Sequence, residues 1–137
     1  MEVSLKNYEI LNAKAALDKL SEQEAASIKT VYALSKISKE VAVHAKDLEE
    51  FKEKLVNEFA VKDEEGRVVH PELENGELNR EVIKLNKPEE FHKKVSELLE
   101  ANVSFSLPSV LTIDMLETAG LKINANDLNR IDKLLSK

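Results

Sequence analysis

The longest uninterrupted pattern in this sequence is an apolar repeat over residues 27–59. Apolar side chains recur there every three or four positions, with no glycine or proline between them, as on one face of an α-helix. A helix of that length is on the order of 50 Å long, whereas a compact chain of this size has a radius of gyration of about 14 Å. The helix is therefore expected to overhang the domain, to bend, or to meet a second copy. The repeat consists of Ile28, Val31, Leu34, Ile37, Val41, Ala45, Leu48, Phe51, Leu55 and Phe59.

The helix predicted before this repeat is too short to cover it. Asn7 can cap a helix over about 8–20, because its side chain accepts hydrogen bonds from the first turn. The rest of the apolar stripe must be covered by the C-terminal helices or by another molecule. Candidate partner-binding residues on or beside the stripe are His44, Leu48, Phe51 and Leu55.

A second face of the long helix carries lysines and a tyrosine. Lys29, Tyr32, Lys36 and Lys39 follow at three- and four-residue spacing, so they share one ridge. This ridge either binds an acidic partner or a phosphorylated ligand, or is a solvated face balanced by Glu40 and by acids of the first helix. Tyr32, Lys36 and Lys39 complete the set of candidate partner-binding residues.

The remaining segments predict short elements. Residues 2–5 alternate as one short edge strand, and residues 60–86 predict a hairpin with Gly66 in its turn, a loop, and a strand over 81–85. These would form a small sheet of two or three strands.

Residues 87–137 form a helical C-terminal part. A capping box of Asn86 and Glu89 opens a helix over about 87–101, and residues 103–107 are extended. Thr112 caps a short helix that ends at Gly120, and Asn124 begins the last one.

Composition agrees with one mainly helical domain over residues 1–137. The 137 residues include only three glycines and three prolines, with 42% hydrophobic residues. The predicted fold class is mainly α with a small β element (α+β), in which the long central helix packs against shorter N- and C-terminal helices.

Charge and composition also exclude several classes of protein. A net charge of −6 and 4% aromatic residues argue against a nucleic-acid binder. The absence of cysteine excludes thiol catalysis, disulfides and thiolate metal sites. No apolar run approaches 18 residues, which predicts a cytoplasmic protein without a membrane segment.

The sequence lacks the groups that catalysis or metal binding would need. Glu89-x-x-His92 has the spacing of a di-metal ligand pair, but no second copy exists. Paired glutamates on a helix point in different directions, and three isolated glycines cannot line a phosphate cradle. We therefore predict no enzyme, no cofactor, and no catalytic or metal-binding residue.

Several motifs follow one another in an order that resembles a known group of proteins. They are Leu17-x-x-Leu20, the run from Lys29 to Lys36, the acidic turn within 59–66, Pro88-Glu89-Glu90-Phe91, Glu97-Leu98-Leu99 and Asn126-Asp127-Leu128. The chain resembles a family of small uncharacterised proteins of tailed phages and prophages of Gram-positive bacteria, and differs in a longer connector over 73–80. This resemblance implies a viral origin and a role inside the host cell.

Together these features favour a small non-enzymatic phage accessory protein that binds another protein, as a host-takeover, anti-defence or assembly factor. Self-association into a dimer would bury the same stripe. The alternatives are a structural component of the virion or tail, and a nucleotide sponge at an oligomer interface.

Overall fold

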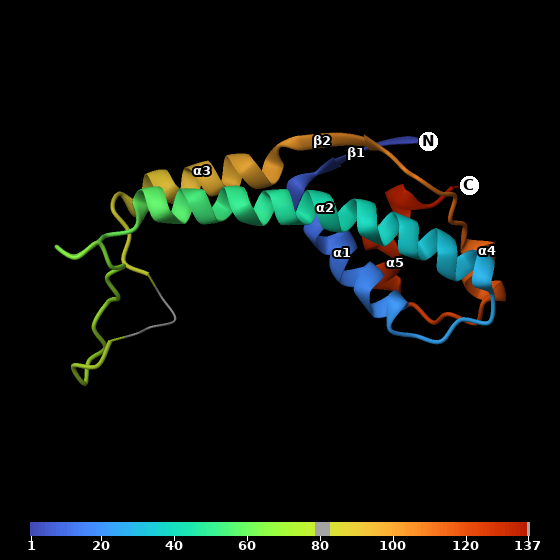
Figure 1. The fold of residues 1–137 in the computed structure, drawn as a ribbon, viewed down its shortest axis with the longest axis horizontal. Helices are drawn as coiled ribbons and strands as arrows, with labels where there is room; N and C mark the ends of the chain where they lie inside the picture. Colours follow the sequence, from blue (N-terminus) through green and yellow to red (C-terminus); the bar gives the residue numbers. More distant parts are fainter. Residues whose placement is uncertain (79–82, 137) are drawn as a thin grey trace. The chain divides into compact units, whose positions relative to one another are not determined.

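The computed structural model describes residues 1–78 and 83–136, and Figure 1 labels their helices and strands. The protein is mainly helical with one small sheet, which confirms the predicted fold class. In chain order the elements are β1 (Glu2–Lys6), α1 (Asn7–Ser21), α2 (Ile28–Phe59), α3 (Pro88–Glu100), β2 (Asn102–Ser106), α4 (Ile113–Thr118), α5 (Ala125–Ile131) and a 3₁₀ turn, η1 (Asp132–Leu134).

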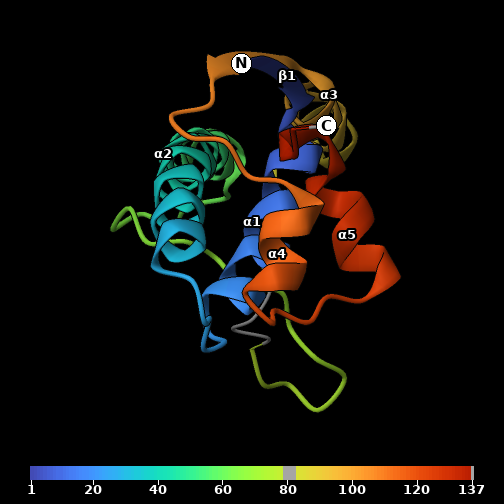
Figure 2. The same ribbon diagram turned by 90° about the vertical axis from the view of Figure 1, so that its right-hand side faces the viewer.

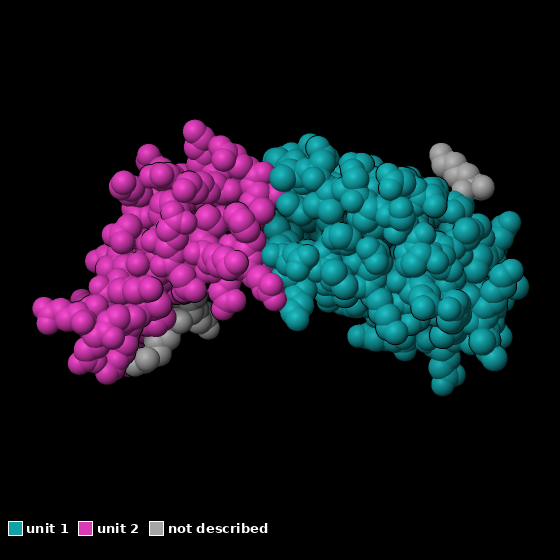
Figure 3. Space-filling model, turned by 45° about the horizontal axis from the view of Figure 1, so that its top comes forward, with its two compact units in different colours: residues 1–48, 99–137 teal, residues 49–98 magenta. Residues whose placement is uncertain are grey.

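The contacts within the chain divide it into two compact units, which Figure 3 colours separately. Unit 1 comprises residues 1–48 and 99–137, and unit 2 comprises residues 49–98. The prediction of a single domain over residues 1–137 stays a prediction, which an unfolding experiment can test.

Unit 1 is built around α1, which Figure 2 shows between α2 on one side and α5 on the other. Ile10 and Leu17 of α1 share one apolar cluster with Ile37 of α2, Leu111 and Ile131, and each is 1% exposed or less. Burial of large aliphatic side chains contributes about 1.5–3 kcal/mol each. This cluster is therefore the main source of stability of unit 1.

Ion pairs tie α1 to the C-terminal segment of unit 1. The buried carboxylate of Asp127 lies 3.3 Å from Lys19 Nζ and 3.1 Å from Arg130 Nη1. The Glu9 carboxylate accepts from Lys133 Nζ at 2.7 Å and from the Lys6 backbone N–H at 3.0 Å. The hydrogen bond from Lys133, followed by that from the Lys6 backbone, lowers the pKa of Glu9 below its ordinary value.

The sheet of unit 1 joins segments that lie far apart in the sequence. β1 and β2 are antiparallel, with Val3 opposite Phe105 and Leu5 opposite Val103. Three of these side chains, Val3, Leu5 and Phe105, are buried in the unit 1 cluster. The prediction of short extended segments at 2–5 and 103–107 is confirmed, whereas the expected sheet within 60–86 is not found among the described residues.

Unit 2 has a smaller core of its own. Leu55 and Phe59 near the end of α2 pack with Phe91 of α3, and the two phenylalanine rings meet edge to face at 5.8 Å. Lys94 of α3 covers the Phe59 ring, with its ammonium 5.2 Å from the ring centre, and lies 3.7 Å from the Glu58 carboxylate.

Between these helices, the described residues 60–78 form two tight turns instead of a regular sheet. Lys62 bridges to Val68 and Glu72 to Leu78, each as an isolated antiparallel bridge. Gly66 has a φ of 82°, which only glycine adopts at little cost, as expected for the predicted hairpin turn. The predicted strand over 81–85 lies partly outside the described residues, and its last residue bridges to Ala60.

The helix boundaries follow the sequence signals closely. α2 is continuous through Ser35 and Ser38 and begins one residue later than predicted. Thr112 caps α4 by accepting from the Met115 N–H at 3.1 Å, and Asn124 caps α5 by accepting from Asp127 N–H at 2.8 Å. These two predicted caps are therefore confirmed. The predicted cap at Asn7 is wrong by one position, because α1 already includes Asn7 as its first residue.

Candidate functional site

The chain itself covers most of the apolar stripe of α2. Leu34, Ile37 and Val41 belong to the core of unit 1, and Leu55 belongs to the core of unit 2. Leu48 and Leu55 are only 5% and 7% exposed, which leaves no appreciable surface on them for another molecule. Their burial shows that most of the stripe is core.

Two further predicted residues have different surroundings. His44 is half-buried, with its ring centre 4.5 Å from that of Phe105 and its Nε2 3.2 Å from Glu40 Oε1. These contacts give His44 a place in the packing of α2 against β2. Phe51 of unit 2 is 51% exposed and is therefore accessible at the surface.

The outer face of α2 in unit 1 exposes a group of large apolar side chains. Ile28 is 88% exposed, Tyr32 61%, Val43 56% and Val31 45%. The Lys36 ammonium lies 5.3 Å from the centre of the Tyr32 ring, a cation–π distance. The ridge of lysines and Tyr32 predicted from the sequence therefore lies on an exposed face of α2. The same face also exposes the aliphatic side chains of Ile28, Val31 and Val43.

Next to this face is a groove between α1 and α2, which we call the α1–α2 groove. It has a volume of about 440 Å³, and Leu20 and Leu34 contribute buried apolar atoms to it. Lys39, one of the predicted residues, lines it. The complete lining is Asp18, Leu20, Ser21, Gln23, Ala25, Val31, Leu34, Ser35, Ser38, Lys39 and Ala42.

The groove wall contains one unusual polar group. Ser38 Oγ is buried and has no hydrogen-bond partner among the described residues. A buried hydroxyl without a partner costs about 1–3 kcal/mol, and native proteins contain few of them. Sequence reasoning did not identify Ser38, because a serine on the side of a helix gives no local signal of its burial.

The electrostatic character of this region differs from that of the whole protein. Over residues 29–46 the only acid is Glu40, and its carboxylate is hydrogen-bonded to His44. Asp18, the one acid in the groove lining, is paired with Lys14 at 2.8 Å. The groove therefore lies beside a positively charged helix face in a chain of net charge −6. The cations of this face are Lys29, Lys36, Lys39 and Lys46, all of them exposed.

The described residues form neither a metal site nor a membrane-spanning helix. Across residues 1–78 and 83–136, no three His, Asp or Glu side chains gather closely enough to hold a metal ion. Glu89 and His92 of α3, the pair with metal-ligand spacing, are both exposed. None of the described helices is both long and apolar enough to cross a membrane.

Comparison of the chain with models of protein families, with curated proteins and with solved structures found no match.

Proposed function

We propose that this chain acts by binding another protein through the α1–α2 groove and the exposed face of α2 beside it. The observation that carries the proposal is the exposure of Ile28, Val31, Tyr32 and Val43 along that face. Single exposed apolar residues are ordinary, but several grouped beside a groove with apolar lining are typical of an interaction site. A helix that presents apolar anchors to such a groove is a common mode of recognition.

The charge of the surface defines the chemistry of the partner. Lys36 and Lys39 stand among the exposed apolar residues, so the complementary surface combines apolar anchors with carboxylates. An amphipathic segment with an acidic rim has this chemistry. The resemblance to proteins of tailed phages and prophages supports a role as an accessory factor in the host cytoplasm, in takeover of the host, in evasion of its defences or in assembly.

The proposal is tested with one variant of the surface and one matched control. Ile28→Glu combined with Tyr32→Ala removes two exposed anchors, and Val110→Glu introduces a charge at a residue of unit 1 that is 58% exposed and lies outside the groove lining. Tagged proteins are recovered from infected or host cells, and each co-purifying protein is then purified and titrated against the three chains. We expect a binary partner that binds the wild type and the control equally, and the double variant at least tenfold more weakly.

Two results would overturn the proposal. A partner that binds all three chains with the same affinity would place the interface elsewhere. Stoichiometric presence of the chain in purified particles would instead assign it to the structural components of the virion.

A further inference from the structure

Unit 2 carries a segment whose chemistry is opposite to that of the α1–α2 groove. Residues 62–78, which we call the acidic turn segment, contain six acids against Lys62 and Arg67. Two apolar side chains in it, Leu73 and Leu78, are 44% and 46% exposed. The acids are Asp63, Glu64, Glu65, Glu72, Glu74 and Glu77, and all are exposed.

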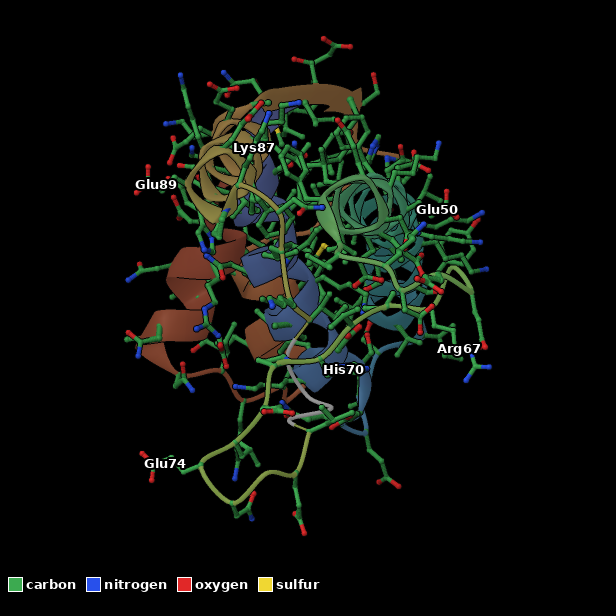
Figure 4. The ribbon with its side chains drawn as sticks, turned by 90° about the vertical axis from the view of Figure 1, so that its left-hand side faces the viewer. Glu50, Arg67, His70, Glu74, Lys87 and Glu89 are labelled. Carbon is green, nitrogen blue, oxygen red and sulfur yellow. The ribbon has the colours of Figure 1, made fainter. Side chains whose placement is uncertain are left out.

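Hydrogen bonds give the second turn of this segment a defined shape. The Leu73 N–H donates to the Glu77 carbonyl at 2.7 Å, and the Gly76 N–H donates to the Leu73 carbonyl at 2.9 Å. The Asn75 side chain accepts from the Glu77 N–H at 3.0 Å. A turn held in this way loses less conformational entropy on binding than a flexible loop. Figure 4 shows the Glu74 side chain pointing outward from this turn.

We infer that the acidic turn segment of one copy of this chain binds in the α1–α2 groove of a second copy. Leu73 stands between Glu72 and Glu74, so the turn presents one apolar anchor flanked by two carboxylates. The groove presents apolar side chains beside Lys39, with Lys36 on the adjoining face. Opposite charges therefore surround an apolar contact on both sides of the interface.

Charge also selects this pairing over contact between two identical grooves. In a symmetric groove-to-groove dimer, the lysines of one helix face would meet the same lysines of the other, which is unfavourable. A two-fold dimer built from turn-to-groove contacts instead repeats the favourable contact twice. The inference rests on the groove being a protein-binding site, as proposed above, and assigns it a second copy of the chain as an occupant.

A charge exchange tests this inference with the full chain. Variant A carries Lys36→Glu and Lys39→Glu, and variant B carries Glu72→Lys and Glu74→Lys. In either variant alone, turn and groove have the same charge, so self-association measured by sedimentation velocity at low salt should weaken at least tenfold. In an equimolar mixture, each groove meets a turn of opposite charge, and association should return to within about threefold of wild type.

A matched control separates this effect from a change in net charge. Lys52→Glu with Lys93→Glu changes the net charge as variant A does, at exposed residues outside the groove lining, and should leave self-association within twofold of wild type. Far-ultraviolet circular dichroism verifies that each variant is folded. Because the interface is ionic, added salt should weaken association of the wild type and of the mixture alike.

A wild-type chain that stays monomeric at millimolar concentration would overturn the inference, as would two monomeric variants that remain monomeric when mixed. Association that neither charge reversal weakens would also overturn it. The proposed function would survive any of these results, provided that Ile28→Glu with Tyr32→Ala still abolished binding of a separate partner. The two failures are therefore distinguishable.

Discussion

Replacing Ser38 with alanine should stabilise this protein. The Ser38 hydroxyl is buried without a hydrogen-bond partner among the described residues, and the substitution removes its desolvation cost of about 1–3 kcal/mol. Alanine also has a better helix propensity than serine, by about 0.5 kcal/mol in a helix interior. Removing one oxygen atom sacrifices van der Waals attraction of only about a few tenths of a kcal/mol. The expected gain in the free energy of unfolding is therefore about 1–3 kcal/mol.

Ser35 provides the matched control for this substitution. It lies on α2 one turn before Ser38 and also lines the groove, but its residue is exposed. Ser35→Ala should therefore gain only the propensity difference of about 0.5 kcal/mol. The difference in free energy of unfolding between the two variants gives the cost of the buried hydroxyl alone, because both substitutions change the helix propensity equally.

Urea denaturation followed by circular dichroism measures both changes. At this chain length, 1 kcal/mol corresponds to roughly 3–5 °C in melting temperature, so a thermal scan resolves the predicted difference. A Ser38→Ala variant no more stable than Ser35→Ala would refute the reasoning. It would mean that the Ser38 hydroxyl is satisfied in solution, and that the groove wall is more hydrated than its geometry indicates.

Other changes test the ion pairs and the second core. Asp127→Ala should cost roughly 1–3 kcal/mol, because it deletes a buried carboxylate that accepts hydrogen bonds from Lys19 and Arg130, while the two exposed cations stay hydrated. Urea denaturation beside the exposed control Asp132→Ala measures this loss. The hydrogen bond from Lys133 lowers the pKa of Glu9, so the wild type should be more stable than Glu9→Gln. This advantage should be complete above the ordinary pKa of 4.5 and should vanish as the pH falls through the lowered pKa, which denaturation at several pH values measures. Phe91→Ala removes a ring from the core of unit 2 and should cost about 3–5 kcal/mol. If residues 1–137 are one cooperative domain, thermal unfolding of this variant should remain a single transition. Separate melting of residues 49–98 would contradict the single domain.

Local chemistry explains which elements could be predicted from the sequence. Thr112 and Asn124 each bond to a backbone N–H three residues later, so the signal and the structure that it specifies occupy the same few residues. The long helix was predictable for a related reason, because its apolar period repeats over many turns without interruption.

The sheet was not predictable in its correct place, because its pairing is not local. Val3 and Phe105 are partners across about a hundred residues, and neither strand contains a feature that specifies the other. The local signals of a hairpin lie instead in residues 60–86, where turn residues separate short apolar runs. The described part of that segment forms two turns with isolated bridges. Beside the Lys62–Val68 bridge, the Val69 N–H donates to the Val61 carbonyl at 2.8 Å, but the pairing does not become a regular ladder among the described residues.

The candidate site was predicted in part, and the missing part has a geometric explanation. Tyr32, Lys36 and Lys39 lie on or beside the groove as a continuous ridge, whereas Ile28 was assigned to the buried stripe. Ile28 is nine residues before the fully buried Ile37, and at about 100° per residue it points to the opposite side of the helix. Residues chosen at every third or fourth position shift gradually around the helix over several turns. The predicted stripe therefore includes residues of both the core face and the exposed face.

The start of α2 departs from what stability alone would favour. Helix N-termini favour acidic side chains, because the helix dipole is positive there, but the first turn of α2 contains no acid and has Lys29 instead. The same turn exposes 88% of Ile28. Two local rules are thus broken on the exposed face of α2 that we propose binds a partner, and such departures concentrate at functional sites. Lys29→Glu should therefore stabilise the chain by about 0.3–1 kcal/mol while weakening the binding of an acidic partner, measured by denaturation and by titration. If Lys29→Glu lowered both the free energy of unfolding and the affinity for the partner, Lys29 would be a structural residue. The positive charge of this face would then need another explanation.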